Sequence, residues 1–183
     1  MREMPVPCAE EMSGRRRTTR VALLAASLAA LVLGASAGAA TLENARGWGG
    51  VELGLPSGWE KVPRAPHAAT GDPQTLLVIG TQGVRPVESD CLVSSYRVPS
   101  DGAVVVVIGW RDSSGVSGIQ PLSGLKLRRG TFECFAGRGG FAQVTRRNRD
   151  FQVNVMVGDR ATPEAIEDAL AAARSFNVVP RAS

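Results

Sequence analysis

The chain has very few of the side chains from which catalytic and metal sites are usually built. Its 183 residues include one histidine, His67, and three cysteines, Cys8, Cys91 and Cys134. A single histidine, set beside a proline in a breaker-rich stretch, excludes a multi-histidine metal site and leaves a serine triad without a well-placed base. We therefore expect no catalytic residue, metal ligand or cofactor, and we favour a protein that is not an enzyme.

Aromatic side chains are also scarce, and the charge is nearly balanced. Phe, Trp and Tyr make up 5% of the residues, and the formal net charge is +4. Proteins that bind single-stranded nucleic acid combine a basic groove with aromatic stacking platforms, so we expect no nucleic-acid partner. The glycine-rich stretches GWGG and GRGG match neither of the common phosphate-binding patterns, which gives no support for a nucleotide site.

The N-terminal 40 residues have the pattern of an export leader. Four arginines (Arg15, Arg16, Arg17 and Arg20) precede an apolar run at residues 21–33, and small residues follow with A-x-A sequences at 35–37 and 37–39. A charged region, an apolar region and a small-residue cleavage site together define a secretory signal peptide. Met12 as the true start would bring the leader within the usual length of about 15 to 30 residues.

The leader is either cleaved or kept as a membrane anchor. Residues 21–40 would form a helix just long enough to cross a hydrocarbon core of about 30 Å, so an uncleaved signal anchor is the alternative to cleavage. We favour cleavage, because the second half of the segment consists mostly of Ala, Gly and Ser, which insert only weakly. In both cases the protein is exported across the cytoplasmic membrane, and it is then either secreted or anchored by its N-terminal helix.

The rest of the chain is long enough for one domain with its own core. We assign residues 41–49 to a short approach, residues 50–180 to a single α+β domain and residues 181–183 to a tail. Export leaves Cys91 and Cys134 as a pair in an oxidising compartment, where cysteines usually form disulfides. We expect a Cys91–Cys134 bridge, with two separate buried thiols as the alternative.

Hydrophobic patterning predicts an antiparallel sheet with one helix. Residues 75–80 and 103–110 are apolar at almost every position, as central strands are. Residues 151–157 alternate between an apolar face and a mainly polar one, and residues 140–146 precede them across the turn sequence RNRD, which predicts a hairpin. Shorter strands are expected on either side of a Pro-Gly turn within residues 51–66, and in residues 91–98, 131–136 and 176–179.

The last long element is predicted to be a helix that ends at about Arg174. Thr162 is suited to cap its N-terminus, and Pro163 to occupy its first position. An apolar stripe follows at helical spacing and would pack on the sheet. It consists of Ile166, Ala169, Leu170 and Ala173.

One motif has a possible catalytic interpretation. Ser123 and Lys126 form an S-x-x-K sequence, in which a serine nucleophile can use the lysine as its base. That chemistry needs a helix, whereas glycine and alternating leucines favour a strand here, with the two side chains on opposite faces. A serine hydrolase using Ser123 and Lys126 is therefore the alternative to a non-catalytic protein.

Arginines gather in the second half of the domain. If the hairpin forms as predicted, several of them could share one edge and bind an anionic partner. The candidate surface consists of Arg138, Arg146, Arg147 and Arg149. The competing interpretation is that they keep strand edges and hairpin ends soluble. Trp48, Trp59 and Trp110 could likewise line a ligand groove or simply pack in and around the core.

Two short stretches resemble a known group of proteins. LPSGWE (residues 55–60) and the closing EDALAAARSFNV (residues 167–178) resemble the two ends of small exported actinobacterial proteins of the Mog1/PsbP-like fold. The resemblance implies an antiparallel sheet flanked by helices, in a fold used mostly for binding and accessory roles, and it carries over no catalytic residue. The expected function is that of an envelope or secreted binding or accessory module, with an unknown envelope component or protein as partner. A purely structural domain on a membrane anchor is a further alternative.

Overall fold

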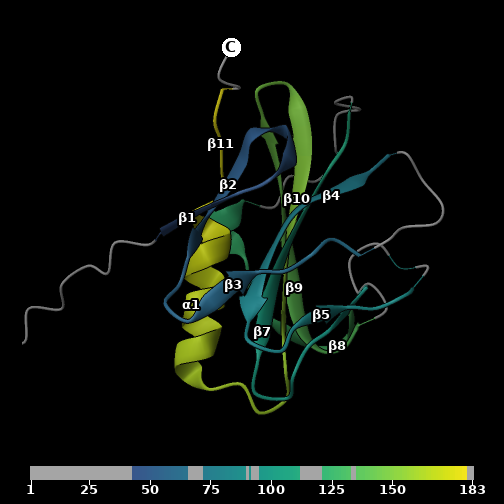
Figure 1. Cartoon of the computed structure of the whole chain (residues 1–183), viewed down its shortest axis with the longest axis vertical. Helices are drawn as coiled ribbons and strands as arrows, with labels where there is room; N and C mark the ends of the chain where they lie inside the picture. Colours follow the sequence, from purple (N-terminus) through teal and green to yellow (C-terminus); the bar gives the residue numbers. More distant parts are fainter. Residues whose placement is uncertain are drawn as a thin grey trace, which may run out of the picture. The chain divides into compact units, whose positions relative to one another are not determined.

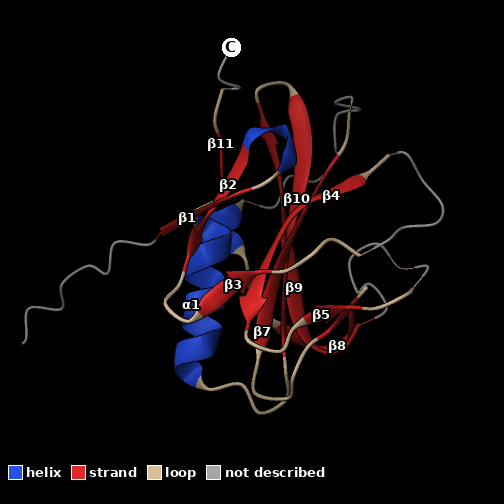
Figure 2. Ribbon diagram, viewed as in Figure 1, coloured by secondary structure: helices blue, strands red, loops and turns tan. Residues whose placement is uncertain are grey.

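Six strands form the main sheet of the protein (Figures 1 and 2). The computed structural model describes residues 43–65, 72–89, 91, 95–111, 121–132 and 135–180, so the expected leader lies outside the described residues. All neighbouring strands of this sheet are antiparallel. In spatial order they are β3 (Trp59–Lys61), β4 (Gln74–Thr81), β7 (Ala103–Gly109), β10 (Arg149–Val157), β9 (Phe135–Arg146) and β8 (Arg128–Phe132).

The middle of the sheet is buried on both faces. Every residue of β7 is buried, and β4 is exposed only partly and only at its two ends. A strand covered on both faces must be apolar at nearly every position, which is the pattern that these two segments show. The prediction of central strands at residues 75–80 and 103–110 is therefore confirmed.

Strands β9 and β10 form the predicted hairpin. Arg147 and Asn148 connect them with φ values of 51° and 57°, and Arg146 pairs with Arg149 across the turn. Left-handed backbone at both central residues is what a two-residue turn matching the twist of the strands requires. The expected polar face of β10 differs in one respect, because its polar side chains are buried almost as completely as its valines.

One face of the main sheet is covered by a helix and a second sheet. The helix is α1 (Pro163–Arg174), and the second sheet contains β1 (Glu43–Arg46), β2 (Val51–Leu55) and β11 (Asn177–Val178). Apolar side chains from all these elements meet in one large core against β4, β7, β9 and β10. We call this side of the main sheet its first face.

Helix α1 begins as predicted. The Ala165 amide donates to Thr162 Oγ1 at 3.2 Å, and Pro163 occupies the first helical position. Of the predicted apolar stripe, Ala169, Leu170 and Ala173 are buried and Ile166 is partly buried against the core. The predicted helix and its packing on the sheet are confirmed.

The second face of the main sheet carries a smaller core. It is covered by the chain that follows β3 and by the short strands β5 (Arg85–Pro86) and β6 (Tyr96–Arg97), with Tyr96 buried against Val106 and its neighbours. The described part of the chain is thus an α+β protein, mostly antiparallel sheet with one C-terminal helix. This confirms the expected class.

Three amides form a hydrogen-bonded line on the second face, which we call the polar row. Gln143 Nε2 donates to Gln152 Oε1 at 3.1 Å, and Gln152 Nε2 donates to Asn154 Oδ1 at 2.7 Å. Asn154 Nδ2 then donates to the carbonyl oxygen of Val106 at 3.2 Å. Buried amides lose water, so such a line replaces the hydrogen bonds that burial removes.

Of the other short strands predicted from the sequence, some are present in the structure and some are not. The two strands expected within residues 51–66 are present as β2 and β3, which lie in different sheets, and the final strand is present as β11. The single strand expected at residues 131–136 is wrong, because the chain reverses there and Phe132 pairs with Phe135. Strand-forming residues on both sides of this reversal concealed it. Of the strand expected at residues 91–98, only Tyr96–Arg97 is a strand among the described residues.

Candidate binding site

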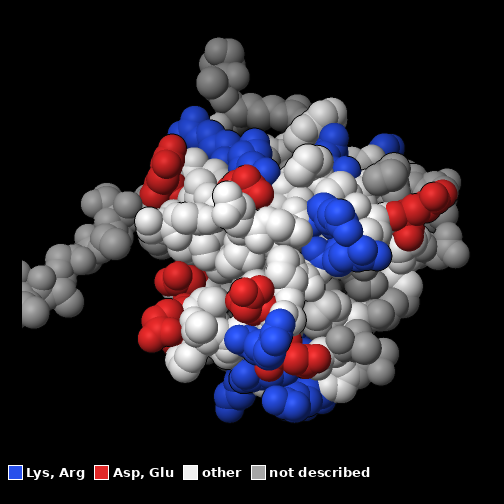
Figure 3. Space-filling view, turned by 60° about the horizontal axis from the view of Figure 1, so that its bottom comes forward, with Lys and Arg blue, Asp and Glu red and all other residues white. Residues whose placement is uncertain are grey.

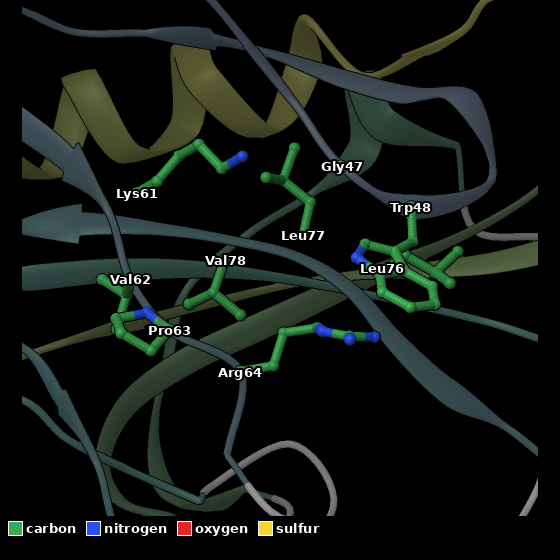
Figure 4. A pocket seen from close by; sticks show the side chains of 9 residues that line it. All are labelled: Gly47, Trp48, Lys61, Val62, Pro63, Arg64, Leu76, Leu77 and Val78. Carbon is green, nitrogen blue, oxygen red and sulfur yellow. The ribbon is translucent and has the colours of Figure 1, made fainter.

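A cavity of about 170 Å³ lies where the two sheets meet beside β3 (Figure 4). Three segments line it: the loop before β2, the end of β3 with the residues that follow, and the middle of β4. The lining residues are Gly47, Trp48, Lys61, Val62, Pro63, Arg64, Leu76, Leu77 and Val78. This cavity is the candidate functional site.

The floor of the cavity is formed where β3 leaves β4. Lys61 pairs with Ile79, and the Val62 amide still donates to the carbonyl oxygen of Val78 at 3.0 Å. Farther along β4 the register with β7 shifts between Thr75 and Leu77, as in a β-bulge. Bulges bend a strand and commonly occur beside functional sites. The apolar side chains of β4 thus form a base for the polar groups above it.

Arg64 reaches across this floor from the segment after β3. The Ala65 amide donates to Tyr96 Oη at 3.0 Å, which fixes the backbone beside Arg64. The guanidinium carbon lies 4.1 Å from the centroid of the Trp48 ring, and Nη1 donates to the carbonyl oxygen of Thr75 at 3.3 Å. A cation on an exposed indole contributes about 0.5 to 1 kcal/mol, enough to favour this arrangement without locking it.

Trp48 is the opposite wall, and 65% of its surface is exposed. Among the described residues it is the one large hydrophobic side chain that is exposed. Its loop, the 3₁₀ turn η1 (Trp48–Gly50), is nevertheless held firmly. Arg149 Nη1 donates to the carbonyl oxygen of Gly49 at 3.2 Å, and the Val179 amide donates to that of Gly50 at 2.8 Å.

Gly47 allows this loop to approach β4. A Cβ atom at Gly47 would lie 2.5 Å from the carbonyl oxygen of Leu76 and 2.6 Å from Leu77 Cβ, closer than real Cβ atoms come to other atoms. Only glycine therefore fits at this crossing without moving the backbone. Close backbone approach of this kind is a common reason for a glycine.

Lys61 forms the third polar wall. Its ammonium group donates to the carbonyl oxygen of Arg46 at 2.8 Å, and the Arg46 side chain is paired with Glu52, Nε to Oε1 at 2.5 Å. Glu52 is thus ion-paired with Arg46, and no carboxylate is among the residues that line the cavity. Among the described lining residues, the charged ones are therefore Lys61 and Arg64, both positive.

All polar side chains that line the cavity are hydrogen-bond donors. Lysine and arginine carry N–H donors and no acceptor, and tryptophan has a single N–H donor. Figure 4 shows the Lys61 and Arg64 side chains extending on opposite sides of Val78, and the indole nitrogen on the side of the ring that faces the other lining residues. The cavity is chemically complementary to a group that only accepts hydrogen bonds and carries negative charge.

The predicted arginine surface is divided by the structure. Arg138 pairs with Val157 at one end of the β9–β10 hairpin, whereas Arg146 pairs with Arg149 at the other. The eight residue steps from Arg138 to Arg146 span about 27 Å at the usual rise per strand residue. The four arginines therefore do not form one surface.

Two of these arginines hold the hairpin against the smaller sheet. Arg147 Nε donates to the carbonyl oxygen of Val178 at 3.0 Å, and Arg149 bonds to the loop that carries Trp48. Arg146 Nη1 donates to the carbonyl oxygen of Thr145. On the face that Figure 3 presents, basic side chains lie in several groups, with acidic ones between them.

The other candidate residues lie away from the cavity or outside the described residues. Ser123 is in the 3₁₀ turn η2 (Leu122–Gly124) rather than in a strand, and both it and Lys126 are exposed. No hydrogen bond joins these two side chains in the described part of the chain. His67 lies outside it. Cys91 is half-buried and disulfide-bonded, but Cys134 is outside the described residues, so their pairing stays a prediction.

The three tryptophans have different surroundings. Trp59 is buried and Trp110 half-buried against the second core, whereas Trp48 lines the cavity. The groove interpretation thus applies to one of them. Lys61 and Arg64 were not singled out from the sequence, because nothing local indicates that a lysine and an arginine after β3 meet a tryptophan before β2. A tryptophan between glycines, as in GWGG, was the available signal.

Within the described ranges, no helix is long and apolar enough to span a membrane, and no three acidic, histidine or cysteine residues converge as a metal site would require. No known protein family matches the chain, and no curated protein matches it.

Proposed function

We propose that this protein is an exported envelope or secreted binding or accessory module, without catalytic activity, whose contact site is the cavity between Trp48 and Lys61. The observation that carries the proposal is the presence of three donor side chains at this cavity, one of which belongs to an exposed tryptophan. Ligand sites are typically hollows lined by apolar and aromatic side chains with a few converging polar groups, and this cavity has that composition.

The hydrolase alternative lacks the contact that it needs. A serine nucleophile requires a base within hydrogen-bonding distance. Ser123 and Lys126 share no hydrogen bond, and neither lines the cavity. We therefore retain binding rather than catalysis as the proposed role.

Export and the finer fold belong to the same proposal. The charged, apolar and small-residue regions of residues 1–40 support export, with cleavage favoured over an anchor. The antiparallel sheet and the closing helix support the Mog1/PsbP-like resemblance, which is typical of binding and accessory domains. A fold alone does not define a function, so the cavity carries the argument.

The proposal is tested by sedimentation with isolated cell envelopes. The protein is purified from its host's membrane and culture fractions, where its intact mass also shows whether the leader has been removed. We expect it to sediment with envelopes in a saturable manner and Trp48→Ala to weaken this at least about tenfold, as for a hot-spot aromatic. Arg85→Gln, an exposed arginine of β5 that lines no part of the cavity, is the matched control. Equal sedimentation of Trp48→Ala and the parent protein would contradict the proposal.

A further inference from the structure

We infer that the cavity binds a carboxylate group carried on a small apolar body. This inference rests on the proposed function and names the ligand class of the same site. It follows from four features: the donors around the cavity, its size, its floor and the orientation of Arg64.

The size of the cavity limits what can enter. Its volume of about 170 Å³ corresponds to roughly five or six water molecules, well below the roughly 300 to 1,000 Å³ of sites that enclose a whole small-molecule ligand. The hollow has room for the end of a larger ligand or for a very small molecule, and it is partly open to solvent. A terminal group that enters from the open side is therefore the occupant that we consider.

The floor favours carbon beside the charged group. Three apolar side chains line the cavity: Val62 and Val78, which are buried in the core of the second face, and Leu77, which is buried in the core of the first face. Phosphate and sulfate present oxygen in every direction and would place some of it against these side chains, which is unfavourable without hydrogen bonds. A carboxylate places its two oxygens at one end and its carbon body at the other, which matches donors on the rim and hydrocarbon on the floor.

Arg64 is oriented to bind a planar anion. Its guanidinium lies over the Trp48 ring, and among the described residues its hydrogen bond is to the Thr75 carbonyl oxygen. A guanidinium presents its N–H donors in its own plane, where two of them match the two oxygens of a carboxylate. Lys61 contributes a second charge from the other side of Val78.

Two sources would supply such a group. One is a free short-chain carboxylic acid, and the other is the C-terminal carboxylate of a polypeptide with small apolar residues. The chemistry at the cavity is the same for both, so the experiment compares them directly.

The experiment is a fluorescence titration of the whole purified protein. Trp48 lines the site, so its emission should change as a carboxylate displaces water beside Arg64, and Trp48→Phe should abolish the change. The probes are butyrate, acetyl-Ala-Ala with a free C-terminus, the amide of each, and inorganic phosphate. We expect saturable binding of the carboxylates and at least about tenfold weaker binding of the amides and of phosphate. Tighter binding of acetyl-Ala-Ala than of butyrate would identify a polypeptide terminus, and the reverse a small acid.

Variants test the assigned contacts. Arg64→Gln and Lys61→Gln should each weaken carboxylate binding at least about tenfold, because each removes a charged donor. Arg64→Lys should recover only part of the loss, since it keeps the charge without the planar pair of donors. Arg85→Gln should bind as the parent protein does.

Three results would overturn the inference: equal binding of acid and amide, unchanged binding by Arg64→Gln, or no saturable change with any carboxylate. The envelope experiment separates these from failure of the proposed function. If Trp48→Ala weakens sedimentation with envelopes but no carboxylate binds, only the inferred ligand class is wrong. If the protein neither sediments through Trp48 nor binds a carboxylate, the proposed function is wrong as well.

Discussion

The two faces of the main sheet are filled by different kinds of side chain. The first face, under helix α1 and the smaller sheet, is filled by one large apolar core. The second face carries the polar row as well as apolar side chains. On the first face, stability depends on how much apolar surface is buried and how tightly it is packed. On the second face, it also depends on whether each buried amide keeps its hydrogen-bond partner.

The largest loss of stability should come from removing a large side chain from the core on the first face. Phe151 is fully buried, with its ring centroid 5.3 Å from that of Phe176. Phe151→Ala should lower the free energy of unfolding by about 3 to 5 kcal/mol, measured by denaturant titration, because it removes apolar contacts and leaves a cavity. Phe151→Leu should cost clearly less. A loss below about 1 kcal/mol for Phe151→Ala would mean that this face is not tightly packed.

A smaller effect is expected from breaking the polar row. Asn154→Ala leaves Gln152 Nε2 and the Val106 carbonyl oxygen without their partner, which should cost about 1 to 3 kcal/mol in the same measurement. Replacing both Asn154 and Gln152 with leucine should cost less than the sum of the single changes, since apolar groups then replace both partners. Additive losses would show that the row is not a coupled unit.

These two changes also show what could be read from the sequence. The strands, the hairpin turn and the helix were predictable because periodicity, turn residues and caps act within a few residues. The burial of Gln152 and Asn154 was not predictable, because these side chains are shielded from water only by the segments that cover the second face. The separation of Arg138 from the other arginines depends on the length of β9. The cavity depends on contact between Trp48 and Arg64, which come from separate segments of the chain.

The smallest effect concerns pH and the second face. Burial raises the pKa of the Tyr96 hydroxyl above its ordinary value of about 10, although the Ala65 amide, the Arg64 charge and Thr75 act in the opposite direction. The unfolded chain therefore loses this proton first as pH rises. Stability linked to Tyr96 is complete below pH of about 10 and is lost as pH rises through the raised pKa.

Tyr96→Phe should isolate this effect. At neutral pH the variant should be less stable by about 1 kcal/mol, because the Ala65 amide loses its acceptor. Above pH of about 10 the difference between the two proteins should narrow. Tyr96 is the single tyrosine of the chain, so ultraviolet absorbance follows its ionisation directly. A constant difference across this range would show that the hydroxyl titrates alike in the folded and unfolded chain.

The close crossing at Gly47 also has a consequence for tracing the ancestry of the cavity. Because a Cβ at this position would strike the backbone of β4, a chain cannot keep Trp48 in place and vary the residue before it. Homologues that retain the cavity should carry a Gly-Trp pair, a lysine at the end of the second strand that follows it, and an arginine three positions after that lysine. That short signature would distinguish descendants that still bind from those that inherited only the fold.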